Sequence, residues 1–305
     1  MALEQKFNDF VKLCEEKKLF IEGVAVADET KLLCEHHFRD DTARNIYSHT
    51  KSFASTAVGL AVDAGKLNLD DRVVDFFPES VPADPAENLD KITLRSLLTM
   101  SSGFNRAYLM AAERRAGQGY PDYVKYMLSR PMETLPGEKF CYSNGDTYLA
   151  ARMAEKAMGM TLENLLYQHL LCAMDIGWPA WEHDPEGHAF GASGLYLKLR
   201  DMIKLGQLYL AGGTWHGRRI LSADWVREAS KKQIETHGND VCGWNNGYGY
   251  QFWISPFPGA YRADGAYGQI TTILPSKGLT VAVQCPDIGK LDDVKIALTD
   301  FINAL

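Results

Sequence analysis

The sequence predicts an α+β fold in which both ends of the chain contribute strands to one antiparallel sheet. Short β-rich runs separated by turn residues occur near both termini, helical patterns begin and end the chain, and the long middle segment has helical periodicity. We therefore expect a sheet that is flanked by the terminal helices, with a mainly helical subdomain inserted beside it. An active site would then lie between the sheet and the insertion.

The chain opens with a helix and a hairpin. Residues 3–17 carry apolar side chains at helical spacing, which is typical of an amphipathic helix. Strands over 21–27 and 31–38 follow, and the turn residues 28–30 between them predict a hairpin.

The middle of the chain and its C-terminal part differ in periodicity. From about residue 48 to residue 221 the sequence has helical periodicity, with glycines where helices would end. A helix is expected over 290–305, and the strands expected before it span residues 248–255, 259–264, 269–275 and 279–285. Because no linker or repeat divides the sequence, we expect a single domain over residues 1–305, with the inserted helical subdomain at approximately 66–221.

Composition excludes several classes of function. The net charge is -7, from 39 acidic and 32 basic residues, and the basic residues are scattered, so nucleic acid is not an expected partner. No apolar run approaches the roughly 20 residues that span a bilayer, and the polar N-terminus lacks a signal-peptide pattern, so we expect no membrane span and a cytoplasmic location. The cysteines and histidines lack metal-ligand spacing and no nucleotide-binding motif occurs, so neither a metal nor a cofactor is expected. No sequence feature indicates an oligomeric state.

Ser48 and Lys51 form the first candidate constellation. They are three residues apart at the start of an apolar segment, 52–64, that predicts a buried helix, so their side chains would be neighbours on one face. A serine hydroxyl needs an adjacent base to act as a nucleophile, and a lysine whose pKa is lowered by burial and by the helix dipole can be that base. The alternative is that Ser48 is only a helix N-cap and Lys51 a solvated side chain.

Further motifs follow in a fixed order along the chain. They are Tyr47-Ser48-His49-Thr50-Lys51-Ser52-Phe53, Leu97-Leu98-Thr99-Met100-Ser101-Ser102-Gly103, Pro136-Gly137-Glu138 with Tyr142-Ser143-Asn144, Gly191-Ala192-Ser193-Gly194-Leu195, and Asp264-Gly265-Ala266-Tyr267-Gly268-Gln269. Through these motifs, over about residues 20–285, the sequence resembles the serine β-lactamase and penicillin-binding-protein superfamily. It is most similar to the branch of class C β-lactamases, D-Ala-D-Ala carboxypeptidases and related esterases, which implies a β-lactamase/transpeptidase-like fold.

The resemblance implies a catalytic role for four residues. Ser48 would be the nucleophile, and Lys51 and Tyr142 would act as a coupled base that also returns a proton to the leaving group. The oxyanion of the tetrahedral intermediate would be bound by the backbone N–H groups of Ser48 and Ala266.

Three more residues are expected to contact the substrate. The resemblance implies that Asn144 offers its amide to the acyl side chain, although Asn144 could instead cap a helix over 145–158. Gly265 would let the substrate backbone approach closely, although a glycine at a strand end is also a common turn residue. Tyr267 is one of six aromatic residues that could line an apolar pocket, although most aromatic residues belong to the core.

The third motif departs from the pattern of the family. Relatives that act on penicillins or peptides carry Lys-Thr-Gly or His-x-Gly, whereas this chain has Ala263-Asp264-Gly265. The cation that would attract a substrate carboxylate is missing, and the side chain of Arg262 should point to the opposite face of the strand. We therefore expect a serine hydrolase that cleaves a small-molecule ester or amide, with weak or absent β-lactamase and carboxypeptidase activity. The alternatives are a β-lactamase or D-Ala-D-Ala carboxypeptidase that recruits a cation from elsewhere, and a catalytically idle ligand-binding homologue.

Overall fold

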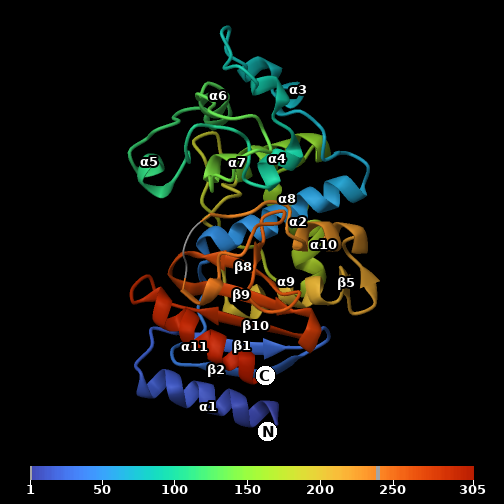
Figure 1. Ribbon diagram of the computed structural model, residues 1–305. Coiled ribbons are helices and arrows are strands. Elements are labelled where there is room, and N and C mark those ends of the chain that lie inside the picture. The colour runs from blue at the N-terminus through green and yellow to red at the C-terminus, as the bar shows by residue number, and fades with distance from the viewer. Residues whose placement is uncertain (1, 238–240) are drawn as a thin grey trace.

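A six-stranded antiparallel sheet forms the centre of the computed structural model, which describes residues 2–237 and 241–305. The strand order is β2-β1-β10-β9-β8-β7. Strands from the two ends of the chain meet where β1 pairs with β10, so the predicted sheet built from both termini is confirmed (Figure 1). The strands are β1 (Gly23–Ala27), β2 (Leu32–His37), β7 (Trp253–Ile254), β8 (Tyr261–Gly265), β9 (Gln269–Leu274) and β10 (Leu279–Gln284).

Strand β1 is apolar on both sides because both faces of the sheet are covered. Successive side chains of a strand point to opposite faces. Val24 and Val26 belong to the hydrophobic core on one face, and Ala25 and Ala27 belong to the core on the other. The sheet therefore separates two hydrophobic cores.

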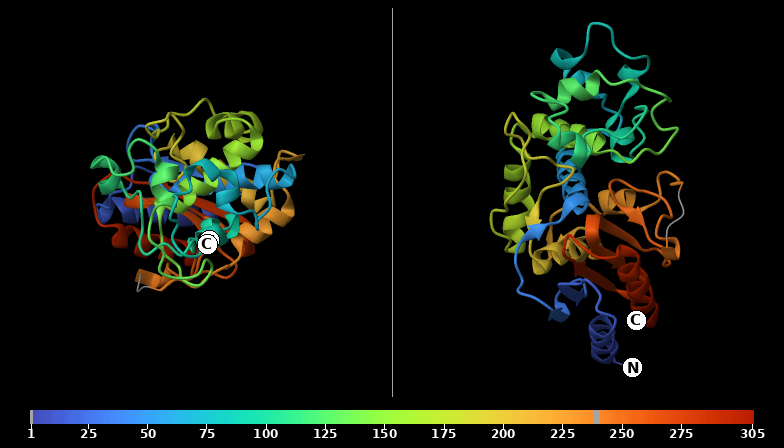
Figure 2. Two further views of the ribbon diagram at one scale, coloured as in Figure 1. Left: turned by 90° about the horizontal axis from the view of Figure 1, so that it is seen from above. Right: turned by 90° about the vertical axis from the view of Figure 1, so that its left-hand side faces the viewer.

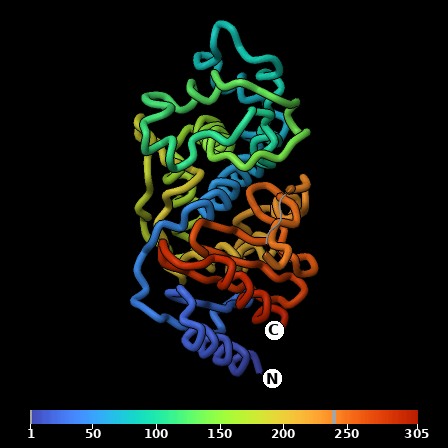
Figure 3. Tube along the Cα trace, turned by 60° about the vertical axis from the view of Figure 1, so that its left-hand side comes forward, coloured from blue at the N-terminus to red at the C-terminus, as the bar shows by residue number. Residues whose placement is uncertain are grey.

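The terminal helices cover the first of these faces. Helix α1 (Leu3–Glu16) and helix α11 (Leu291–Ala304) pack against each other, with the ring centroids of Phe10 and Phe301 4.5 Å apart. Both helices are amphipathic and bury their apolar stripes beneath the sheet. The predicted helices that flank the sheet are therefore confirmed, and both chain termini lie at this end of the molecule (Figure 3).

Helix α9 (Leu199–Leu210) covers the opposite face, where it contacts β1, β9 and β10. Gly206 allows this close approach, because a Cβ atom there would lie 2.3 Å from Oγ1 of Thr280. Helix α9 falls inside the range 66–221, so part of the expected insertion belongs to the layer that covers the sheet. The division of the chain at residues 66 and 221 stays a prediction.

Helix α2 (Thr50–Asp63) lies between the sheet and a group of helices beyond it, as Figure 2 shows. It is buried along most of its length and packs against α7 (Asn144–Met158), which fits its apolar composition. The first residues of α2 therefore lie where the two parts of the molecule meet. The other helices are α3 (Val73–Phe76), α4 (Leu94–Leu98), α5 (Ala111–Arg115), α6 (Tyr123–Leu128), α8 (Leu162–Leu166) and α10 (Ala223–Ser230).

The strand expected over 248–255 forms only at Trp253–Ile254. Before that point the backbone finds partners outside the sheet, because the N–H of Tyr250 donates to the carbonyl of Ala229 at 3.0 Å. Gln251 has a left-handed φ of 66°, which a continuous strand does not allow. The apolar residues of this segment therefore belong to an irregular loop that packs on the helices.

Two short ladders complete the strands that the structure describes. They are β3 (Arg44–Asn45) with β4 (Tyr196–Leu197), and β5 (Thr214–Trp215) with β6 (Arg218–Arg219). In the described part of the chain, none of the helices has the length and apolar character that crossing a membrane requires.

Candidate active site

Ser48 lies in a tight turn that connects β3 to α2. The turn is a short 3-10 helix, Tyr47–His49, and Tyr47 adopts a left-handed φ of 48°. The carbonyl of Leu195 accepts from the N–H of Ile46 at 2.9 Å, which fixes the start of the turn to the neighbouring chain. Ser48 is partly exposed, so its hydroxyl is accessible to a substrate.

Lys51 lies in the first turn of α2 and is 1% exposed. Its Nζ donates to Oδ1 of Asn144 at 2.5 Å and to the carbonyl of Ala192 at 2.7 Å. Burial lowers the pKa of Lys51 well below its usual value, the cation of Arg114 lowers it further, and the carboxylate of Asp146 opposes these effects. Lys51 is therefore buried, and the alternative of a solvated side chain does not fit; its role as the base for Ser48 stays a prediction.

Tyr142 connects these two residues. The Ser48 side chain lies close enough to the phenol of Tyr142 to lower its pKa, and Nζ of Lys51 lies 5.1 Å from the centroid of the Tyr142 ring. The ring stacks on Trp253 with a centroid distance of 5.4 Å, which holds its orientation. Burial raises the pKa of Tyr142 above its usual value, so the resting side chain is the neutral phenol at neutral pH.

Asn144 lies between Lys51 and the segment before α5, and its expected contact with a substrate stays a prediction. Its Oδ1 accepts from Lys51, and its Nδ2 donates to the carbonyl of Leu109 at 3.0 Å. The side chain therefore links the lysine to the loop before α5. It does not cap a helix over 145–158, because α7 begins at Asn144 itself and Ser143 takes the N-cap position.

The end of β8 lies directly against the turn that holds Ser48. A Cβ atom at Gly265 would be 2.1 Å from the carbonyl oxygen of Ile46, so only glycine fits there without movement of the backbone. Ala266 follows as the first residue of a 3-10 helix, Ala266–Gly268. Tyr267 is 46% exposed, and its ring centroid lies 5.2 Å from that of Tyr47. These residues thus line one side of the serine.

The third-motif strand presents no free cation to the site. Ala263 is buried in the core. Arg262 points to the other face of β8, as strand alternation predicts, where its Nε donates to Oδ2 of Asp264 at 2.8 Å and its guanidinium lies 4.8 Å from the Trp244 ring centroid. The charges of Arg262 and Asp264 therefore largely neutralise each other, and both act on the pKa of Tyr142, which Asp264 raises and Arg262 lowers.

Sequence reasoning missed two buried titratable residues beside this site. His49 is fully buried with Nε2 2.9 Å from Oγ1 of Thr271, and burial lowers its pKa to about 3, so the ring stays neutral. Asp146 is fully buried in the first turn of α7, accepts from the N–H of Ser102 at 3.4 Å, and has its pKa raised by burial to about 7. Their positions next to Ser48 and Asn144 are the only sequence signals that could have indicated them.

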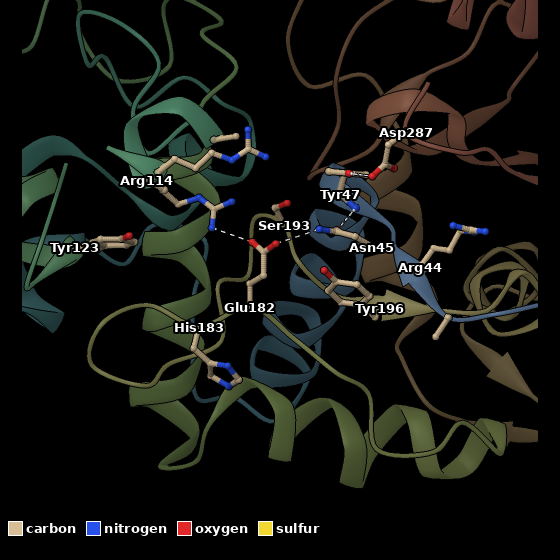
Figure 4. Close-up of a pocket in the computed structure, with 13 residues that line it drawn as sticks. Arg44, Asn45, Tyr47, Arg114, Tyr123, Glu182, His183, Ser193, Tyr196 and Asp287 are labelled. Carbon is tan, nitrogen blue, oxygen red and sulfur yellow. Dashed lines mark hydrogen bonds and ion pairs between the residues drawn. The ribbon is translucent and has the colours of Figure 1, made fainter. Parts of the chain in front are cut away.

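A cavity of about 700 Å³ lies beside the Ser48 turn (Figure 4). Its walls come mainly from residues 43–47, 111–115 and 182–196, together with Asp287. Glu182 lies at its centre, where Oε2 accepts from Nη1 of Arg114 at 3.0 Å and Oε1 accepts from Nδ2 of Asn45 at 3.1 Å. This cavity could not be predicted from the sequence, because its walls come from distant segments.

Comparison with known proteins gives a family for the whole fold. A family model described as Beta-lactamase matches residues 18–287. The 6-aminohexanoate-dimer hydrolase of Paenarthrobacter ureafaciens is 24% identical over 275 residues, which cover 83% of this chain and 67% of that protein. Penicillin-binding protein 4 of Amycolatopsis lactamdurans is 25% identical over 271 residues, which cover 77% of this chain and 70% of that protein.

Solved structures have the same architecture. The crystal structure of a family VIII carboxylesterase matches with a TM-score of 0.76 and 17% sequence identity, covering 100% of this chain and 98% of that one. At this level of identity the likeness shows a shared fold and no more. Because the family model covers most of the sequence, the chain belongs to the β-lactamase family and is a hydrolase of the β-lactamase-like superfamily.

Proposed function

We propose that this protein is a serine hydrolase that cleaves an ester or amide through an acyl-enzyme on Ser48. The observation that carries the proposal is the position of the Tyr142 ring, which has the Ser48 side chain near its hydroxyl and the buried amine of Lys51 5.1 Å from its centroid. A serine needs such an adjacent base to become a nucleophile. A buried lysine with a lowered pKa supplies an uncharged amine closer to neutral pH than a solvated lysine would.

In the proposed acylation step, Oγ of Ser48 attacks the carbonyl carbon of the substrate. The proton of the hydroxyl passes to the base formed by Tyr142 and Lys51, and a tetrahedral intermediate forms. The carbon–oxygen or carbon–nitrogen bond then breaks, and the same pair returns the proton to the leaving alcohol or amine. A water molecule attacks the ester on Ser48 in the second half-reaction, so that the acid is released and the serine is restored.

The oxyanion of each tetrahedral intermediate would be bound by the N–H groups of Ser48 and Ala266. Both residues lie in the first turn of a 3-10 helix, where backbone N–H groups have no acceptor within the helix. Gly265 keeps these two turns in direct contact. Donors that are already oriented toward the developing charge stabilise the transition state strongly.

The substrate class follows from the third motif. Ala263 supplies no cation, and the buried guanidinium of Arg262 is paired with the carboxylate of Asp264. A β-lactam or a C-terminal D-alanine, whose carboxylate needs a cation at this strand, is therefore not the favoured substrate. The similar proteins are named as a 6-aminohexanoate-dimer hydrolase, a penicillin-binding protein and a carboxylesterase. The hypothesis of an esterase or amidase fits this strand best.

Hydrolysis of p-nitrophenyl butyrate and of a cephalosporin tests the proposal. We expect measurable ester turnover and little cephalosporin turnover by the wild type. Ser48→Ala should lower kcat/KM for the ester at least about a thousand-fold, because the nucleophile is lost. Tyr142→Phe should lower it about a hundred-fold or more, because proton transfer is impaired.

Ser129→Ala is the matched control, because this serine is exposed on the surface. It should retain wild-type kinetics. Ester turnover that survives in Ser48→Ala would contradict the assignment of the nucleophile. Cephalosporin turnover as fast as that of the ester would contradict the proposed substrate class.

A further inference from the structure

The cavity shown in Figure 4 begins at the nucleophile turn. Tyr47, the residue before Ser48, forms part of its wall. Ser193 also lines it and directly follows Ala192, whose carbonyl accepts a hydrogen bond from Lys51. A group attached to a carbonyl carbon held at Ser48 would therefore extend into this space. The inference below rests on the proposed function, because it concerns the acyl group of the same substrate.

Most charges around the cavity already have partners. Both carboxylate oxygens of Glu182 accept hydrogen bonds, one from Arg114 and one from Asn45. Arg44 forms an ion pair with the buried carboxylate of Glu22 beneath the cavity wall. Because these opposite charges are paired, this part of the cavity wall carries little net charge.

Two exposed side chains of opposite charge that line the cavity have no ion-pair partner among the residues that the structure describes. Arg115, in α5, is exposed and has no acidic partner within ion-pair distance in residues 2–237 and 241–305. Asp287 is also exposed and has no basic partner within the same range, although its Oδ2 accepts from the hydroxyl of Tyr47 at 2.6 Å. In Figure 4, Asp287 and Tyr47 lie across the cavity from Arg114.

We propose that this cavity binds a zwitterionic group on the acyl side of the substrate, with its carboxylate at Arg115 and its ammonium at Asp287. An apolar acyl chain would remove water from the side chains of Arg115 and Asp287 and from the polar cavity wall. It would not replace the hydrogen bonds that these groups make with water. A group with a single charge would leave either Arg115 or Asp287 without a partner. The volume is within the range of sites that take small molecules.

Four primary amides that differ only in the charges on one carbon test this arrangement. Butanamide is neutral, 4-carbamoylbutanoate carries the carboxylate, 4-aminobutanamide carries the ammonium, and glutamine carries both. Dissociation constants measured by isothermal titration calorimetry at pH 7 do not depend on turnover. We expect each charge to tighten binding about three- to fivefold, as for exposed ion pairs. One enantiomer of glutamine should therefore bind about ten- to twenty-fivefold more tightly than butanamide.

Two substitutions separate the charges. Arg115→Gln should abolish the gain from the carboxylate and keep the gain from the ammonium. Asp287→Asn should do the reverse, and its amide oxygen can still accept from Tyr47. Arg218→Gln is the control, because it removes an exposed arginine from the β5–β6 ladder, outside the cavity. It should preserve both gains.

Parallel assays with p-nitrophenyl butyrate keep the two proposals apart. Equal affinity for all four amides, or charge gains that persist in both cavity variants, would overturn the inference even while Ser48-dependent ester hydrolysis continued. A gain from only one of the two charges would also overturn it, because the occupant would then be singly charged. Absence of ester hydrolysis in the wild type, with the charge gains present, would instead overturn the proposed function.

Discussion

Lys51 is the residue on which the proposed chemistry depends most. Burial is the largest cause of its lowered pKa, and two charged side chains outside the sequence motif act on it in opposite directions. Arg114 reaches the site from α5, and Asp146 from the first turn of α7. The proton affinity of Lys51 is therefore set by residues from three different elements.

Opposite shifts of the pH profile are expected when these two charges are removed. The acid limb of kcat/KM reports deprotonation of the base in the free enzyme. Arg114→Gln removes a cation and leaves Glu182 uncompensated, so the pKa of Lys51 should rise and the limb should move to higher pH. The carboxyl group of Asp146 is negatively charged at pH values above its pKa of about 7. Asp146→Asn removes this charge, so the pKa of Lys51 should fall and the acid limb should move to lower pH.

The pH dependence of p-nitrophenyl butyrate hydrolysis measures both shifts. Arg218→Gln serves as the control for the loss of a cation far from Lys51. Shifts in the same direction for the two variants, or no shift in either, would show that Lys51 is not the group that titrates.

At the residue scale, the sequence predicted the catalytic candidates that have local spacing. Ser48 and Lys51 are neighbours on one helical turn, and that proximity follows from three residues of separation. Arg114 and Asp146 could not be found in the same way. Their approach to Lys51 depends on the packing of α7 on α2 and on the contact of Arg114 with Glu182, which no local pattern encodes.

The contact between the end of β8 and the Ser48 turn is the critical feature at the scale of elements. Gly265 adopts an ordinary extended conformation, so its requirement for glycine is a matter of space and not of backbone angle. The obstacle is the carbonyl of Ile46, which belongs to the backbone and cannot rotate away as a side chain can.

Gly265→Ala should therefore separate the two N–H groups of the proposed oxyanion hole. We expect kcat/KM for p-nitrophenyl butyrate to fall about a hundred-fold, because misplacement of catalytic groups by about 1 Å has this effect. Gly177→Ala is the control, since a Cβ there would meet no atom within 4 Å. Wild-type kinetics in Gly265→Ala would contradict the role assigned to this contact.

Helices and strands whose apolar residues repeat at a clear period could be predicted from the sequence, and segments without such a period could not. The hairpin of β1 and β2 and the strands β8, β9 and β10 follow from alternation and turn residues. The segment before β7 has strand-like composition, yet its N–H groups donate to the carbonyls of Ala229 in α10 and of Leu98, the last residue of α4. Tertiary contacts decided its conformation, and composition could not reveal them.

At the scale of the whole molecule, the sheet separates the site from the packing of the chain termini. Phe10 and Phe301 stack in the core beneath the sheet, whereas α2 and the Ser48 turn lie above it. Stability and catalysis should therefore be separable by substitution.

Phe301→Ala should lower the free energy of unfolding by about 3–5 kcal/mol, because a large buried ring is lost. Urea unfolding measures this change, and kcat/KM of the folded protein should stay the same. Ile296→Ala, at an exposed position of the same helix, should change stability by only about 0.5 kcal/mol. A large loss of kcat/KM in folded Phe301→Ala protein would show that the two cores are coupled.

The sheet built from both termini could be predicted because strand and helix patterns lie at both ends of the sequence. The cavity beside Ser48 could not, since its walls join segments that are more than 60 residues apart, such as helix α5 with Arg114 and the loop of Glu182. The packing of α9 on the sheet was missed for a similar reason. An amphipathic helix shows which of its faces is buried, but not against which element.

The central claim is that Ser48 forms a covalent acyl-enzyme. The most direct test is intact-protein mass after incubation with a fluorophosphonate, followed by peptide mapping, for the wild type and Ser48→Ala. We expect a single adduct that maps to Ser48 and is absent from Ser48→Ala. An adduct on another residue, or no adduct on folded wild-type protein, would contradict it.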